Sequence, residues 1–409
     1  MHCNGSPRNS SIGCEQINTN VGEMIHRDLA YRGYGELHFG WGVRHELTHL
    51  LQSHFPLARN VLLICGSRGL LETDAYSDLR KQLQTDNRRA IHFFQIRSGE
   101  PTVDSVDNAV QQARKHACDL VISLGGGAAI DTAKAVSALY PAPDSKSVRS
   151  YLEGVGDGAK IEWQPLPTIA IPTTAGTGAE VTKNAVLQCP NPLVKKSLRH
   201  PELVPSLAIV DPEFTVSCPR EVTAHSGMDA ITQCVEAFVS CRATAQTRAW
   251  ALTGLSLGLR SLSTAISFPM DRGARTDLSA CATYSGYALA YGGLGMAHGV
   301  AAALGAVCNL RHGLACAILL PISITANLRT ARKPYDELAE ALEFQQAEVL
   351  LDAIKSLSDK LQIPSRLGDV GVKESQIEQL VELSFGNSMS GNPVPIRPDE
   401  LRVILRDSL

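Results

Sequence analysis

The pattern of apolar and polar positions divides the chain into two parts with different periodicity. Between residues 36 and 210, short apolar runs typical of buried strands alternate with segments in which leucine, valine and alanine recur at helical spacing. The expected strands of this part span residues 36–39, 61–65, 91–96, 120–124, 168–171 and 207–210. Because strands that alternate with helices at this spacing form βαβ units, the pattern predicts an α/β domain built on a parallel sheet.

The alternation stops after Asp211-Pro212, and from Ala224 onward only helical periodicity remains, broken by glycine and proline. Before that point, residues 185–188 and 196–200 flank the turn CPNPLV and predict a small β-hairpin. We therefore expect an α/β domain over residues 31–212 and an all-helical domain over residues 213–409. The polar first 30 residues lack the apolar core of a secretory signal and predict a flexible extension.

Composition narrows the possible partners and compartment. The net charge of the 409 residues is −3 and no basic block occurs, which argues against nucleic acid or an anionic membrane as the main partner. Residues 290–310 are apolar enough to suggest a membrane span, but His298 at their centre favours a buried helical segment. The eleven cysteines are scattered without a CxxC pair, a pattern typical of reduced thiols in a cytoplasmic protein.

A glycine turn follows the expected strand 120–124. Gly125, Gly126 and Gly127 lead directly into a helix, so the backbone can approach an anion and the free N–H groups of the helix start can bind it. The same residues also fit a simple tight turn. At the carboxyl end of a parallel strand, however, they predict a cradle for a pyrophosphate. The run PTTAGTGAE (residues 172–180) adds a second polar loop after the next strand.

A second group of polar residues lies in the helical part. Asp229 and Gln233 are four residues apart and share a helix face, with Glu236 one turn further on. His298 and His312 are fourteen residues apart, close to four turns, and would share a face if their helix were continuous. A carboxylate, an amide oxygen and two imidazoles suit a divalent metal such as Fe(II) or Zn(II). Buried core histidines and a charge at a helix start would explain the same residues without a metal.

Four motifs in this order resemble the iron-containing (group III) alcohol dehydrogenases. They are GGGxxxDxxK, PTTAGTGxE, GxDAxxQxxE and HG…RHG, and the likeness extends from about Glu36 to the C-terminus, including GNPVP at residues 391–395. The resemblance implies an architecture like that of dehydroquinate synthase, with an α/β dinucleotide-binding domain and a helical domain on either side of a cleft. It also implies an NAD(P)-dependent alcohol dehydrogenase or aldehyde reductase that acts on small molecules, and a homodimer.

The resemblance assigns roles to individual residues. It implies that the glycine turn Gly125, Gly126 and Gly127 holds the pyrophosphate. The remaining cofactor contacts that it implies are Thr173, Thr174, Thr177, Asn184 and Lys195. The four family metal positions correspond to Asp229, Gln233, His298 and His312, of which Asp229, His298 and His312 are the expected catalytic ligands.

This chain departs from the family pattern at three places. Gln233 stands where the family usually has histidine, which predicts a weaker site or one with three ligands. Ala302 stands where a histidine often takes part in proton transfer. Gly66, Ser67 and Arg68 replace the acidic residue that selects NAD; this favours NADP(H), with use of both cofactors as the alternative. Two other functions stay open, a metal-independent reductase of the maleylacetate reductase type and a nucleotide-binding homologue without activity.

Overall fold

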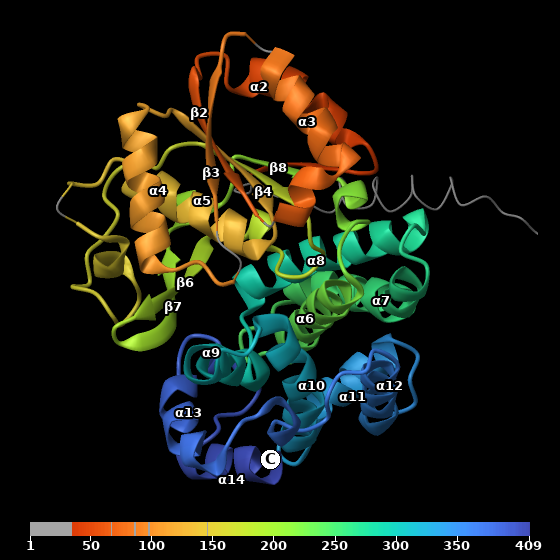
Figure 1. Cartoon of the computed structure of the whole chain (residues 1–409). Coiled ribbons are helices and arrows are strands. Elements are labelled where there is room, and N and C mark those ends of the chain that lie inside the picture. The colour runs from red at the N-terminus through yellow and green to blue at the C-terminus, as the bar shows by residue number, and fades with distance from the viewer. Residues whose placement is uncertain (1–34, 67, 86, 97–98, 145) are drawn as a thin grey trace, which may run out of the picture.

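The computed structural model describes residues 35–66, 68–85, 87–96, 99–144 and 146–409. The expected N-terminal extension, residues 1–30, lies outside this part of the chain. Figure 1 shows an α/β domain in the upper half of the molecule and helices in the lower half.

The α/β domain is built on a six-stranded sheet in the order β1-β8-β5-β4-β2-β3, and every strand pair in it is parallel. The strands are β1 (Glu36–Phe39), β2 (Asn60–Cys65), β3 (Ala90–Gln95), β4 (Leu120–Gly125), β5 (Thr168–Pro172) and β8 (Leu207–Val210). The predicted parallel sheet is therefore confirmed, with the third strand beginning one residue earlier than expected. The central strands β2, β4 and β5 are mostly apolar because helices cover both faces of the sheet.

Two pairs of helices cover the sheet, one pair on each face (Figure 1). One pair is α2 (Leu47–His54) with α3 (Asp74–Thr85), and the other is α4 (Val103–Lys115) with α5 (Gly127–Leu139). Alternate residues of β2 point to opposite faces: Val61 and Leu63 pack in the cluster with α2 and α3, and Leu62 and Ile64 pack with α4 and α5.

The predicted hairpin consists of β6 (Asn184–Pro190) and β7 (Leu193–Arg199), which pair antiparallel. It is longer than expected because pairing continues up to the turn at Asn191-Pro192. One side of the hairpin packs on α4 and α5, and β7 also contacts α9 of the helical domain. The hairpin therefore connects α4 and α5 of the α/β domain to α9, the helix that carries His298.

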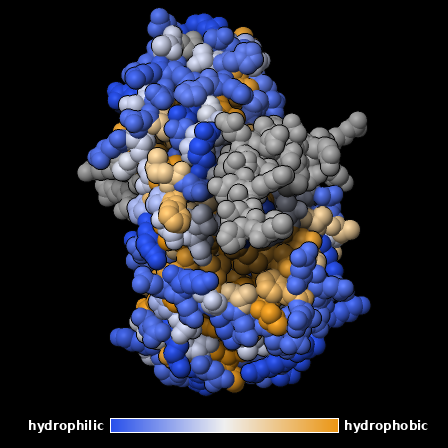
Figure 2. Space-filling view, turned by 90° about the vertical axis from the view of Figure 1, so that its right-hand side faces the viewer, coloured by the Kyte–Doolittle hydropathy of each residue, from blue (hydrophilic) through white to orange (hydrophobic). Residues whose placement is uncertain are grey.

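The second domain is helical, as predicted. Its helices are α6 (Arg220–Val239), α7 (Ala245–Ser267), α8 (Arg272–Gly292), α9 (Met296–Cys308), α10 (His312–Leu328), α11 (Arg332–Ala341), α12 (Ala347–Lys360), α13 (Ile377–Ser384) and α14 (Pro398–Asp407). Its core extends to the sheet, because Phe39 and Val210 belong to the same apolar cluster as α6 and α8. Figure 2 shows one face of the molecule, on which apolar residues gather in the lower half and hydrophilic residues surround them.

Within the described residues, no single helix is long and apolar enough to cross a membrane. Together, α8 and α9 would be long and apolar enough, but the chain bends by 101° between them. The apolar segment 290–310 that includes His298 thus spans the end of α8 and the buried helix α9.

Candidate active site

The glycine turn and the threonine loop meet at the carboxyl edge of the sheet. Gly66, Gly125 and Thr173 follow or end the neighbouring strands β2, β4 and β5. The Gly66 amide donates a hydrogen bond to the Leu124 carbonyl (2.9 Å), and the Thr173 amide donates one to the Gly125 carbonyl (3.0 Å). The chain proceeds outward from β2 to β3 and then crosses back to β4, so Gly66 and Gly125 lie where the strand order reverses. Sheets of this type bind nucleotides at that position.

The three glycines of the turn leave no room for side chains. A Cβ on Gly125 would lie 2.7 Å from the Ala129 Cβ and 3.1 Å from the Gly66 Cα. On Gly126 it would lie 3.0 Å from the Thr174 Oγ1, and on Gly127 it would lie 2.8 Å from the Thr177 Oγ1. The glycine turn and the threonine loop therefore form one surface of backbone amides and hydroxyls beside the start of α5, which suits a pyrophosphate.

The other expected cofactor residues lie on the hairpin. Asn184 begins β6, where its carbonyl accepts a hydrogen bond from the Lys134 Nζ (3.1 Å). Lys195 on β7 forms an ion pair with Glu100, with 2.8 Å between Nζ and Oε1. Ser67 lies outside the described residues.

Glu100 belongs to the turn before α4, and the sequence alone did not indicate it as a site residue. Burial on its own would raise the pKa of Glu100, but the charges of Lys195 and His312 lower it. The Glu100–Lys195 pair therefore stands within electrostatic reach of the histidine cluster.

Asp229, His298 and His312 converge from three helices, α6, α9 and α10. The Asp229 Oδ1 lies 3.2 Å from the His298 Nε2 and 3.8 Å from the His312 Nε2. The helix through the two histidines is not continuous, so they do not share one helix face: α9 ends at Cys308, Asn309 takes a left-handed conformation (φ 53°), and α10 begins at His312. The two rings nevertheless approach to 5.4 Å between centroids, because the separate helices pack against each other.

Glu236 fixes the orientation of His298. Its Oε2 lies 2.6 Å from the His298 Nδ1, and its Oε1 accepts a hydrogen bond of 2.6 Å from the Ala297 amide. A carboxylate can only accept, so Nδ1 carries the hydrogen and Nε2 faces Asp229. A histidine held in this way by a carboxylate is typical of metal sites in proteins.

The electrostatics of the cluster favour a cation. Burial alone would raise the pKa of Asp229, but the two histidines hold it at about 2, so this carboxyl is ionised. Burial alone would lower the pKa of His298, but Cys316, Glu236 and Asp229 raise it well above its usual value. Burial and the charge of Lys195 lower the pKa of His312 to about 4. His298 thus lies with one ring nitrogen facing Glu236 and the other facing Asp229, an environment that favours positive charge.

Gln233, the expected fourth ligand, forms a hydrogen bond with α8, whereas Cys316 lies among the donor atoms. The Gln233 Oε1 accepts a hydrogen bond of 2.6 Å from the Ser285 Oγ on α8. Cys316 lies one turn after His312, and its Sγ belongs to the same group of donor atoms as Asp229, His298 and His312, all within 4.8 Å of one another. Sequence reasoning missed this cysteine, although its spacing of four residues from His312 was a signal.

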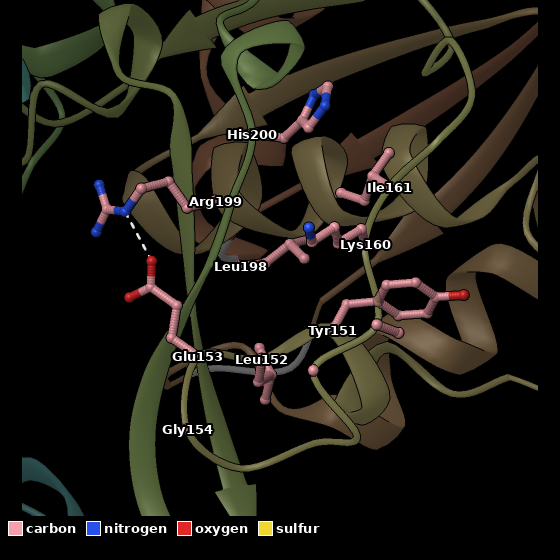
Figure 3. A pocket seen from close by; sticks show the side chains of 11 residues that line it. Tyr151, Leu152, Glu153, Gly154, Lys160, Ile161, Leu198, Arg199 and His200 are labelled. Atoms are coloured by element: carbon pink, nitrogen blue, oxygen red, sulfur yellow. Dashed lines mark hydrogen bonds and ion pairs between the residues drawn. The ribbon is translucent and has the colours of Figure 1, made fainter.

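A cavity of about 390 Å³ lies elsewhere, between the loop at residues 151–161 and the end of β7 (Figure 3). Figure 3 shows Arg199 and Glu153, whose Nε and Oε1 are 2.8 Å apart, at its side. None of the residues expected to bind the cofactor or metal lines this cavity.

Comparison with known proteins establishes the family. The model of the family described as "Iron-containing alcohol dehydrogenase" matches residues 35–212, and that of "Fe-containing alcohol dehydrogenase family, C-terminal" matches residues 223–409. The chain therefore belongs to the iron-containing alcohol dehydrogenase family, and it is an oxidoreductase that acts as an alcohol dehydrogenase.

Individual relatives and structures agree with this assignment. Long-chain-alcohol dehydrogenase 1 of Geobacillus thermodenitrificans is 31% identical over 90% of this chain and 93% of its own length. The 1-propanol dehydrogenase PduQ of Salmonella typhimurium is 32% identical over 86% of this chain and 93% of its own. A crystal structure of 1,3-propanediol oxidoreductase superposes with a TM-score of 0.84 at 27% identity and covers 92% of this chain and 99% of that one.

Proposed function

We propose that this protein catalyses reversible hydride transfer between a nicotinamide cofactor and the carbinol carbon of a small alcohol, with a divalent metal held by Asp229, His298 and His312. The observation that carries the proposal is the convergence of these three side chains from α6, α9 and α10 with the Glu236 carboxylate behind His298. A bound metal would polarise the carbonyl oxygen in reduction and lower the pKa of the bound alcohol in oxidation.

The donor atoms fit such an ion. Two imidazole nitrogens and one carboxylate oxygen are ligands that Fe(II) and Zn(II) accept. Ligand atoms about 2.0–2.2 Å from one tetrahedral ion lie roughly 3.3–3.6 Å apart. The distances from the Asp229 Oδ1 to His298 (3.2 Å) and to His312 (3.8 Å) lie close to that range.

The protein's own residues supply binding, orientation and exclusion of water. The backbone amides of the glycine turn bind the pyrophosphate, and Thr173, Thr174 and Thr177 lie beside them toward the helical domain. Ala302, on α9 four residues after His298, carries no group that could transfer a proton. We therefore assign proton transfer from the substrate to solvent water rather than to a histidine at this position.

For the cofactor, we propose a preference for NADP(H). The support is the sequence at the end of β2, where Cys65 and Gly66 provide no carboxylate to repel a 2′-phosphate. The ratio of kcat/KM for NADPH to that for NADH tests this preference. A ratio above about ten, which is a difference of about 1.4 kcal/mol, supports it, and a ratio that favours NADH contradicts it.

The first test combines elemental analysis with assays. The purified protein is analysed for iron and zinc and assayed for NADPH and NADH oxidation against short aldehydes, with and without a chelator. We expect about one metal per chain and chelator-sensitive turnover. Turnover that persists without metal would favour the metal-independent reductase, and cofactor binding without any turnover would favour the inactive homologue.

A double variant tests the ligands themselves. His298→Ala/His312→Ala should abolish turnover and metal binding while nucleotide binding, measured by NADPH fluorescence, is retained. The matched control is His45→Ala/His49→Ala, which removes two exposed histidines of the α/β domain. Retained turnover in the first variant would remove the metal from the mechanism.

A cytoplasmic location and a homodimer also stay predictions. An exposed apolar area, such as the one on the lower half of Figure 2 with hydrophilic residues beside and below it, is typical of a contact between proteins and supports the dimer. Sedimentation of the purified protein measures the oligomeric state directly.

A further inference from the structure

We propose that Cys316 supplies the fourth protein ligand of the metal, as a thiolate, and that Gln233 is not a ligand. The inference rests on the proposed function, because it concerns the same metal site. It changes the ligand set from carboxylate, amide and two imidazoles to carboxylate, thiolate and two imidazoles.

The geometry of α10 carries this proposal. His312 and Cys316 are one turn apart and project from the same face of the helix. The Cys316 Sγ lies 3.7 Å from the His312 Nε2, and Cys316 is fully buried. A sulfur at about 2.3 Å and a nitrogen at about 2.0 Å from one tetrahedral ion are roughly 3.5 Å apart, so the observed separation fits two ligands of one metal.

The thiol is also linked to the other two ligands. The Cys316 Sγ lies within 4.8 Å of the donor atoms of both Asp229 and His298. Cys316 thus lies among the donor atoms rather than in an apolar part of the core. Cys281, by contrast, is a buried cysteine that faces Cys234 and Gly258, away from the cluster.

Gln233 is engaged in another contact. Its amide oxygen accepts the hydrogen of the Ser285 hydroxyl at 2.6 Å, which ties it to α8. A neutral amide oxygen is also a weak ligand for a transition metal, whereas a thiolate is a strong one and favours zinc. Both the contact and the chemistry select Cys316 over Gln233.

The formation of the metal–sulfur bond is a proton exchange. A cysteine binds a metal as the thiolate, so the thiol hydrogen of Cys316 must leave. Binding of the metal releases this proton to solvent and forms the metal–sulfur bond, with no change of oxidation state.

Cobalt(II) substitution under anaerobic conditions tests the proposal, because a thiolate bound to Co(II) gives an intense charge-transfer absorption in the near ultraviolet. The proteins to compare are the wild type, Cys316→Ser, Gln233→Ala and, as the matched control, Cys281→Ser. We expect the band in the wild type, in Gln233→Ala and in Cys281→Ser, and its loss in Cys316→Ser. Chelator competition should show that Cys316→Ser binds zinc at least about 100-fold more weakly, since even loss of an outer partner costs about 10–100-fold.

The outcomes separate this inference from the proposed function. A wild-type protein that binds one Co(II) without the near-ultraviolet band overturns the Cys316 assignment and leaves the three-ligand site in place. A band that survives in Cys316→Ser, or zinc affinity that falls in Gln233→Ala but not in Cys316→Ser, also overturns it. Failure of the wild type to bind Co(II) overturns both proposals. The wild-type spectrum needs no variant, so misfolding of Cys316→Ser would not prevent a decision.

Discussion

Replacement of Glu236 by glutamine tests how the protein prepares His298 for a metal. The carboxylate of Glu236 accepts hydrogen bonds at both oxygens, from the Ala297 amide and from the His298 Nδ1, each at 2.6 Å. Glutamine has only one acceptor oxygen, and its NH2 group can only donate. In Glu236→Gln one of the two contacts must therefore bring two donors together, unless His298 changes its tautomer.

The change of tautomer has a specific cost. If the amide introduced by Glu236→Gln donates to Nδ1 of His298, the hydrogen of the ring moves to Nε2, which is the nitrogen that faces Asp229. A metal on Nε2 requires the ring hydrogen on Nδ1, so in the metal-bound variant either Nδ1 of His298 or the Ala297 amide would face the donor NH2 group. Loss of an outer partner of this kind typically weakens metal binding about 10–100-fold, which is about 1.4–2.7 kcal/mol at 25 °C.

Competition with a calibrated chelator measures this loss for zinc or cobalt(II). The matched control is Glu340→Gln, which removes an exposed glutamate of α11 and should leave metal affinity unchanged. Nucleotide affinity should be the same in both variants, because Glu236 does not contact the glycine turn. A Glu236→Gln protein with wild-type metal affinity would refute the role of Glu236 in setting the tautomer.

Three further predictions concern packing and pH. Gly125→Ala should lower the free energy of unfolding, measured in urea, by about 1–3 kcal/mol and should weaken NAD(P)H binding. The reason is that the new Cβ would lie 3.1 Å from the Gly66 backbone. Gly386→Ala, with open space around it, is the control. Gly178→Ala should destabilise the fold more than Gly125→Ala and reduce soluble expression, since Gly178 has φ +60° and a Cβ there would lie 2.5 Å from the Gly286 Cα. A Gly178→Ala protein with the wild-type free energy of unfolding would contradict this close contact with α8. Burial raises the pKa of Asp131 to about 6, so the folded protein binds more protons than the unfolded chain between about pH 4 and pH 6. The free energy of unfolding should therefore fall by up to about 3 kcal/mol as the pH rises through that window. Asp131→Asn should lack this component of the pH profile, and identical profiles for the two proteins would exclude Asp131 as its source.

The sequence predicted the fold well because the pattern of apolar residues changes sharply from the α/β domain to the helical one. Buried strands such as 61–65 and 120–124 are almost entirely apolar, with Ser123 as the one polar residue, and such short runs before glycine turns are typical of strands. The motifs also allowed Asp229, His298 and His312 to be selected, and the structure brings them together.

The contacts that depend on tertiary packing could not be predicted. The break between α9 and α10 follows from the left-handed Asn309, which helical spacing does not reveal. The Ser285–Gln233 hydrogen bond and the Glu100–Lys195 ion pair join residues that are far apart in sequence. Cys316 was missed because a cysteine in an apolar helix is typical of a core, and only its neighbours from α6 and α9 distinguish it.

The metal-binding residues come from three separate helices, and this determines when a newly made chain can bind the ion. Asp229 and His312 are separated by 83 positions, and Asp229, His298 and His312 lie on three different helices. The most that one local segment of a newly made chain contributes is the His312–Cys316 pair of α10, so the site is complete only after α6, α9 and α10 dock. The metal therefore binds late in folding. Which ion binds depends on the folded site and on the metal ions that are available in the cell at that stage.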